Sequence, residues 1–147
     1  MAKKKITKKE KEFIRKRAKG CCEYCAYPEY YANQFYAGEH THPSSKGGID
    51  DVKNYALACQ PCNNHKYNKT EGLDPATGKV VPLFNPRQQN WLDHFVWSPD
   101  LILIHAVTPI GRATIHTLHL NRESLQRMRA VLLLIDEHPP KHLRLGG

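Results

Sequence analysis

The sequence lacks any apolar stretch long enough to cross a lipid bilayer. Its longest unbroken aliphatic run covers residues 131–135, whereas a membrane-spanning helix needs about 20 consecutive apolar residues. The lysines at positions 3–5 are not followed by an apolar stretch. We therefore expect no secretory signal, no membrane partner and a cytoplasmic location.

Internal repeats and low-complexity linkers are also missing. The 147 residues match the length of one domain, and their 40% hydrophobic and 24% charged content is that of an ordinary globular protein. This composition excludes wholesale disorder. We expect a single domain over 1–147, with a basic N-terminal helix (1–19), a cysteine-containing core (20–72) and a C-terminal extension (73–147).

Acidic residues are scarce at the N-terminus. Residues 1–19 hold ten basic side chains and two acids, which accounts for the net charge of +8, because the other 128 residues carry twelve of each sign. Such a segment suits a polyanion, most simply a nucleic-acid backbone. A solvated, solubilising helix would have the same composition. The candidate phosphate contacts are Arg15, Lys16 and Arg17.

A helix is expected within this segment. Thr7 and Glu10 have the spacing of a capping box, in which each side chain bonds to the backbone N–H of the other residue. Gly20 is a typical residue at a helix end. These signals predict a helix over about 8–19.

The five cysteines give a sharper signal. In the absence of a secretory signal, disulfides are not expected. Two C-x-x-C pairs separated by 33 residues have the form of a four-thiolate zinc site, with no open position for catalysis. A redox pair or unliganded thiols are the alternatives. The expected ligands are Cys22, Cys25, Cys59 and Cys62, whereas Cys21 is expected to be a packing thiol.

Polar residues between and after the two cysteine pairs suggest a second site. Glu39 and His40 lie side by side at the end of an expected strand (34–40), and Asn63 directly follows the last cysteine. A carboxylate and an amide oxygen suit a hard cation such as magnesium. A neighbouring imidazole can act as a general base on water.

This part of the sequence resembles the HNH endonucleases, whose core consists of two strands, a helix and a metal. The resemblance is specific over about residues 15–70 and extends more weakly over most of the chain. It rests on Cys22-Glu23-Tyr24-Cys25, Glu39-His40 with Pro43, Ser45, Gly47 and Gly48, Asn54, and Cys59-Gln60-Pro61-Cys62-Asn63-x-x-Lys66.

The resemblance implies a role for each matching residue. His40 would be the general base, Glu39 and Asn63 would hold a catalytic Mg²⁺ or Mn²⁺, and Asn54 would pin the loop that orients the base. Lys66 would touch phosphate or stabilise the loop. The four paired cysteines would hold structural Zn²⁺, and the products would carry 5′-phosphate and 3′-hydroxyl ends.

Two departures from the family pattern affect these assignments. Glu39 is one methylene longer than the aspartate usual at that position, so a metal would sit differently or the carboxylate would fold back. His42 is a second imidazole two residues from His40. Residues two apart on a strand face the same side, so spacing alone does not choose the base, although the His-x-x-Pro register favours His40.

The expected fold is α+β: an HNH-type ββα-metal core stapled by the four-cysteine zinc site, followed by a β-hairpin and a helix. The hairpin is predicted over 101–107 and 112–120, and the helix after residue 121, with Leu125, Met128, Leu132 and Ile135 on its apolar face.

The predicted function is a divalent-metal-dependent endonuclease that contacts the backbone of double-stranded DNA. The main alternative is a catalytically silent zinc module that binds nucleic acid. A third possibility is a structural zinc domain with a protein partner. Oligomeric state and target are left open by the sequence.

Overall fold

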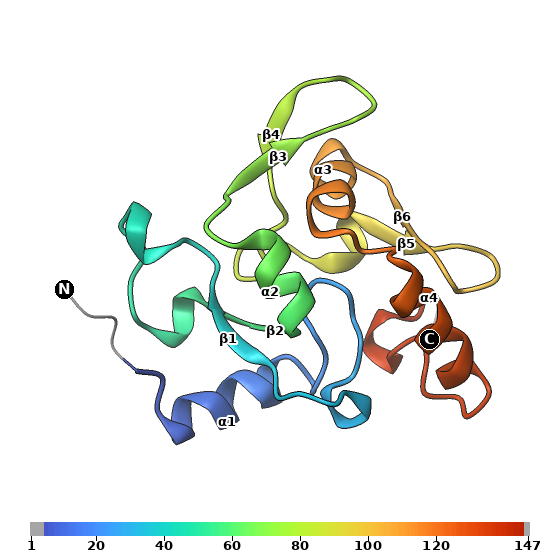
Figure 1. Ribbon diagram of the computed structural model, residues 1–147, viewed down its shortest axis with the longest axis horizontal. Coiled ribbons are helices and arrows are strands. Elements are labelled where there is room, and N and C mark those ends of the chain that lie inside the picture. The colour runs from blue at the N-terminus through green and yellow to red at the C-terminus, as the bar shows by residue number, and fades with distance from the viewer. Residues whose placement is uncertain (1–4, 146–147) are drawn as a thin grey trace.

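The computed structural model describes residues 5–145, so residues 1–4 of the basic segment lie outside the description. Helices and small antiparallel sheets alternate along the chain (Figure 1), which confirms the expected α+β class. The elements are α1 (Lys8–Arg17), β1 (Ala37–His40), β2 (Tyr55–Ala58), α2 (Gln60–Lys66), β3 (Glu71–Leu73), β4 (Val80–Pro82), β5 (Phe95–Trp97), β6 (Ile104–Ala106), α3 (Pro109–Leu118) and α4 (Glu123–Leu133).

The capping box at the start of α1 is confirmed. The backbone N–H of Glu10 donates to Thr7 Oγ1 at 3.1 Å, and the N–H of Thr7 donates to Glu10 Oε1 at 2.9 Å. The helix ends at Arg17, two residues earlier than predicted. Lys19 and Gly20 both have positive φ, which a continuing helix does not allow.

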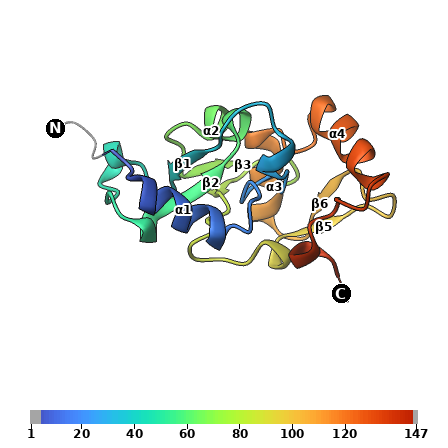
Figure 2. The same ribbon diagram turned by 90° about the horizontal axis from the view of Figure 1, so that it is seen from below.

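The β1–β2 sheet lies between α1 and α2, as Figure 2 shows. Gly38 on β1 allows α1 to approach, since a Cβ at this position would lie 2.5 Å from Ile6 Cδ1 and 3.2 Å from Ile14 Cδ1. Strand β2 is buried along its whole length. Strand β1 begins at Ala37, later than the predicted residue 34, and pairs in register with β2 from Ala37 opposite Ala58 to His40 opposite Tyr55.

Helix α2 begins immediately after Cys59. Pro61 lies in its first turn, where a missing N–H costs nothing because the first helical N–H groups have no partner within the helix. This start places Cys62 and Asn63 inside the helix, and α2 ends at Lys66.

The predicted second strand over 112–120 is wrong, because these residues lie mostly in α3. Thr108 caps that helix by accepting from the N–H of Gly111 at 3.0 Å, and Pro109 occupies its first turn. Thr-Pro is therefore a helix start here, not a hairpin turn. The C-terminal hairpin exists, but β6 pairs with β5.

A further hairpin, β3–β4, surrounds a turn at 74–78. Asp74 organises this turn by accepting from the N–H of Ala76 and the hydroxyl of Thr77. Arg112 of α3 makes two hydrogen bonds to the Asp74 carboxylate, at 2.8 and 2.9 Å, and these bonds hold the pKa of Asp74 below its usual range. The pair fastens the hairpin to α3.

Helix α4 buries only part of its predicted apolar face. Leu125 and Leu132 are buried, whereas Met128 is 36% exposed and Ile135, beyond the end of the helix, is 55% exposed. Arg129, a charged residue of the same helix, is buried and donates to the carbonyls of Ile102 and Leu120. Within the described residues, no helix combines the length and apolarity that crossing a membrane demands.

We predict that Gly111→Ala lowers the free energy of unfolding by roughly 1–3 kcal/mol. Alanine normally favours a helix by up to about 1 kcal/mol over glycine, but a Cβ here would lie 2.4 Å from the backbone oxygen of His94. Urea unfolding monitored by circular dichroism measures the change. The control is His116→Ala, at an exposed position of the same helix, whose free energy of unfolding should stay within about 0.5 kcal/mol of the parent. A Gly111→Ala protein more stable than the parent would show that the backbone of His94 does not crowd a Cβ at this position.

Candidate functional site

Four sulfur atoms converge next to the start of α2. The Sγ atoms of Cys22, Cys25, Cys59 and Cys62 all lie within 4.8 Å of one another, and those of Cys25 and Cys59 are 3.7 Å apart. A zinc–sulfur bond of about 2.3 Å gives a tetrahedron with edges of about 3.8 Å. The sulfurs therefore fit a closed structural zinc site, as their spacing predicts.

Arg122 is part of this site, although no sequence pattern indicates it. Its guanidinium donates to the sulfurs of Cys59 at 3.4 Å and Cys62 at 3.6 Å, and also to the carbonyls of Leu118 and His119 at the end of α3. Bonds to thiolate sulfur from a neighbouring cation offset the negative charge of a four-cysteine zinc site. Arg122 thus ties the C-terminal extension to the cysteine cluster.

Cys21 lies outside the cluster. Its side chain is buried, and the residue forms an isolated β-bridge with Pro28. This position matches the predicted packing role.

Asn54 holds the loop between β1 and β2. Its Oδ1 accepts from the hydroxyl of Thr41 at 2.8 Å and from the N–H of His42 at 2.9 Å. Its Nδ2 donates to the carbonyls of His42 and Ile49, both at 2.9 Å. One buried amide therefore joins the two ends of the loop, directly after His40.

The two glycines in this loop, Gly47 and Gly48, allow its backbone to fold tightly. A Cβ on Gly48 would lie 1.8 Å from the backbone oxygen of His42, so no larger residue fits without moving the chain. Gly47 has φ of 88°, a conformation that favours glycine. These contacts keep the loop folded against the residues that follow β1.

His40 is the last residue of β1, and its side chain is 10% exposed. Its Nε2 lies 2.7 Å from Asp50 Oδ1, and its ring packs edge-on against Tyr55 with 5.0 Å between centroids. The imidazole is thus held on two sides.

His42 occupies a different environment. It lies beyond the end of β1, so the alternation of strand faces does not apply to it. The residue is exposed, and its Nε2 is 2.8 Å from the carbonyl oxygen of Lys46 within the same loop.

Glu39 points into the interior. Its Oε1 accepts from the hydroxyl of Tyr24 at 2.5 Å and its Oε2 accepts from Lys66 Nζ at 2.8 Å, and the side chains of Glu39 and Lys66 are each 2% exposed. Burial raises the pKa of Glu39, and the Lys66 ammonium counteracts this rise. In this arrangement the carboxylate is not an open metal ligand.

Lys66 also binds the backbone that follows Glu39. Its Nζ is 3.2 Å from the carbonyl of Thr41 and 3.4 Å from that of His40. Of the two roles that the resemblance implies for Lys66, this burial favours loop stabilisation over a phosphate contact.

Asn63 and His40 line the same cavity, of about 510 Å³. The cavity lies between the end of β1, the loop and α2. Its walls are Gly38, Glu39, His40, Pro43, Ser44, Ser45, Asn63, Asn64, Tyr67 and Asn68. An imidazole and an amide thus face one solvent-accessible space.

The three basic residues singled out on α1 differ in their availability. Lys16 is exposed. Arg15 pairs with Glu29 at 2.9 Å. Arg17 donates to the carbonyls of Val52 and Tyr55 at 2.8 and 2.6 Å, so it mainly fastens α1 to the chain around β2.

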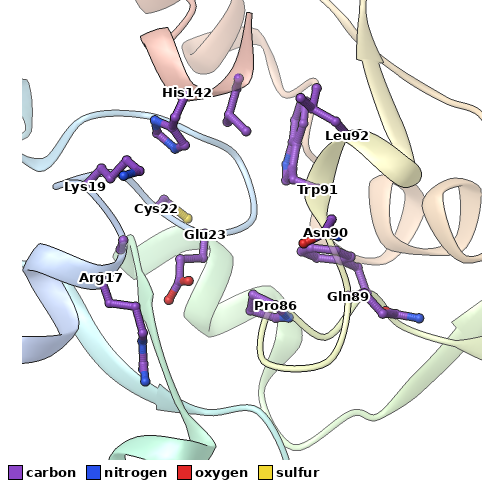
Figure 3. A pocket seen from close by; sticks show the side chains of 13 residues that line it. Arg17, Lys19, Cys22, Glu23, Pro86, Gln89, Asn90, Trp91, Leu92 and His142 are labelled. Carbon is purple, nitrogen blue, oxygen red and sulfur yellow. The ribbon is translucent and has the colours of Figure 1, made fainter. Parts of the chain in front are cut away.

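A second cavity, of about 400 Å³, lies between the first cysteine pair and the segment around Trp91 (Figure 3). Glu23 lies near its centre, and burial raises the pKa of Glu23 to about 7. Its carboxylate accepts from the N–H of Leu57 and pairs with Arg87. These bonds fasten the first cysteine pair to β2 and to the segment before Trp91, so we assign Glu23 a structural role.

Comparison with known proteins gives one match. Residues 22–69 match the family model described as HNH endonuclease. The matched span begins at the first clustered cysteine and ends three residues beyond Lys66, so it contains the sulfur cluster, the loop and the cavity. Searches of curated proteins and of solved structures give no match.

We predict that the protein purifies with about one zinc ion per chain and that Cys62→Ser abolishes zinc retention. Loss of the metal should also lower thermal stability strongly, because zinc binding supplies folding free energy. Elemental analysis and thermal circular dichroism measure both effects. Cys21→Ser is the matched control and should retain zinc, and full zinc content in Cys62→Ser would contradict the assignment.

We predict that Lys66→Met lowers the free energy of unfolding by about 3–5 kcal/mol, because it leaves a buried carboxylate without its counter-ion. The double variant Glu39→Gln/Lys66→Met removes the charge as well and should recover part of this loss. Denaturant titration of the two variants and the parent measures the coupling. Equal stability of the single and double variants would show that the pair is not coupled.

Proposed function

We propose that this protein, whose residues 22–69 match the family model described as HNH endonuclease, is a divalent-metal-dependent endonuclease that hydrolyses phosphodiester bonds in DNA. The observation that carries the proposal is the cavity shared by His40 and Asn63 beside the sulfur cluster. HNH domains are generally nucleases, and that activity needs an imidazole facing a space where a phosphodiester can bind.

His40 is the proposed general base. It would take a proton from a water molecule that attacks phosphorus, and cleavage of the P–O3′ bond would leave 5′-phosphate and 3′-hydroxyl ends. His40 is supported over His42 because its ring is held by Asp50 and Tyr55 and lines the cavity. The ring of His42 bonds to its own loop.

Asn63 is the proposed ligand of the catalytic metal, and Glu39 is the second ligand that the family resemblance implies. A divalent ion would supply positive charge to the reacting phosphate when bound. Asn63 fits this role, since it faces the cavity. Glu39 does not fit it in the arrangement described, because its oxygens bond to Tyr24 and Lys66. Variants of Asn63 and Glu39 therefore distinguish which of the two residues binds the metal.

The engaged carboxylate is the observation that favours the alternative function, a silent zinc module that binds nucleic acid. Both functions include a DNA contact, for which exposed Lys8, Lys9 and Lys16 on α1 supply positive charge. Contacts of this kind hold the phosphate backbone without reading base sequence. DNA affinity alone does not separate the two functions, whereas cleavage does.

We predict that the purified protein converts supercoiled plasmid to open-circular or linear DNA with Mg²⁺ or Mn²⁺ and not with chelator. His40→Ala should lower the cleavage rate by at least about 10²-fold, because it removes the general base. Agarose gel electrophoresis of a time course measures the products.

The matched control is His42→Ala, which should cut at nearly the parental rate. If His42→Ala alone abolished cleavage, the assignment of the base to His40 would be wrong. In the same assay, Asn63→Ala and Glu39→Gln separate the two candidate ligands, because loss of a true ligand raises the metal concentration needed for half-maximal cleavage. Salt-sensitive DNA binding without cleavage in any metal would support the silent module.

A further inference from the structure

A carboxylate that the sequence patterns did not single out lies within hydrogen-bond distance of the His40 ring. Asp50 Oδ1 lies 2.7 Å from His40 Nε2, and the Asp50 side chain is 29% exposed. Asp50 reaches His40 from the opposite end of the loop, ten residues along the chain.

The loop is built to bring this carboxylate to the imidazole. Asn54 Nδ2 donates to the carbonyl of Ile49, the residue before Asp50, and Asn54 Oδ1 accepts from the N–H of His42, two residues after His40. Gly48 packs directly on the backbone of His42. The same contacts that fold the loop therefore set the distance between His40 and Asp50.

We infer that Asp50 is the positioning residue of the proposed general base. The inference rests on the function proposed above and adds a residue to it. Nε2–H would donate to Asp50, which fixes the ring and leaves Nδ1 to accept the proton of water. The positive charge that forms on the ring would then be stabilised by the adjacent carboxylate, as in catalytic carboxylate–imidazole pairs.

The other charged or titratable groups near His40 interact mainly with residues other than its ring nitrogens. Tyr55 contacts the ring through its own ring, and Glu39 faces the interior, where Lys66 neutralises it. Asp51 accepts from the N–H of Lys53 at 2.9 Å and caps a short 3₁₀ turn. Burial raises the pKa of the Tyr55 hydroxyl, and the carboxylates of Asp50, Glu10 and Asp51 add to this rise.

We predict that Asp50→Asn lowers the rate of plasmid cleavage by about 10²–10⁴-fold, the range found when the partner of a catalytic imidazole is removed. Asp51→Asn is the matched control and should leave the rate near that of the parent.

A second measurement tests the pair without activity. Long-range ¹H–¹⁵N NMR correlations report which ring nitrogen of His40 carries the proton in the neutral form. We expect Nε2–H as the dominant neutral form of the parent and loss of this preference in Asp50→Asn. An unchanged tautomer in Asp50→Asn would overturn the inference, even if cleavage fell.

The two measurements separate this inference from the proposed function. If the parent protein does not cut DNA but the NMR signature of the pair depends on Asp50, the function fails and the His40–Asp50 interaction stands. If the parent cuts DNA, His40→Ala is inactive and Asp50→Asn cuts at the rate of the parent, the function stands and the positioning role fails.

Discussion

The convergence of four cysteine sulfurs is the interaction on which the rest of this structure depends. It brings the turn after α1 to the start of α2, although 33 residues separate Cys25 from Cys59. The β1–β2 sheet forms within that interval, and α2 begins at the second cysteine pair. Arg122 extends the same anchor to the C-terminal extension through its bonds to Cys59 and Cys62.

Around this anchor, the candidate site is organised by buried polar contacts. Asn54 joins both ends of the loop, and Lys66 neutralises Glu39 while binding the backbone that follows it. The buried side chains of Asn54, Glu39 and Lys66 all have hydrogen-bond partners, which is the condition for keeping such groups in an interior. The result is a loop whose shape is fixed, beside a cavity that is open to solvent.

The sequence predicted those features that local chemistry determines. The capping box of Thr7 and the four-cysteine zinc site could be predicted, because each consists of characteristic residue types at a characteristic spacing. The fold of 108–120 was not predictable in the same way, because Thr-Pro suits either a turn or a helix start and only packing of α3 against its neighbours decides. Arg122 and Asp50 lie far along the chain from the groups they contact, so no local pattern marks them.

The placement of the loop inside the cysteine interval has a topological consequence. A metal bound by Cys22, Cys25, Cys59 and Cys62 would close the backbone into a ring, and His40, Asp50 and Asn54 all lie on that ring. The metal would fasten both ends of the segment between the two cysteine pairs at one point. This reduces the conformational freedom of that segment before any side chain packs. A single backbone break within 43–49 would leave two fragments that still share the metal, so the two halves of the site would remain together although the chain between them was cut.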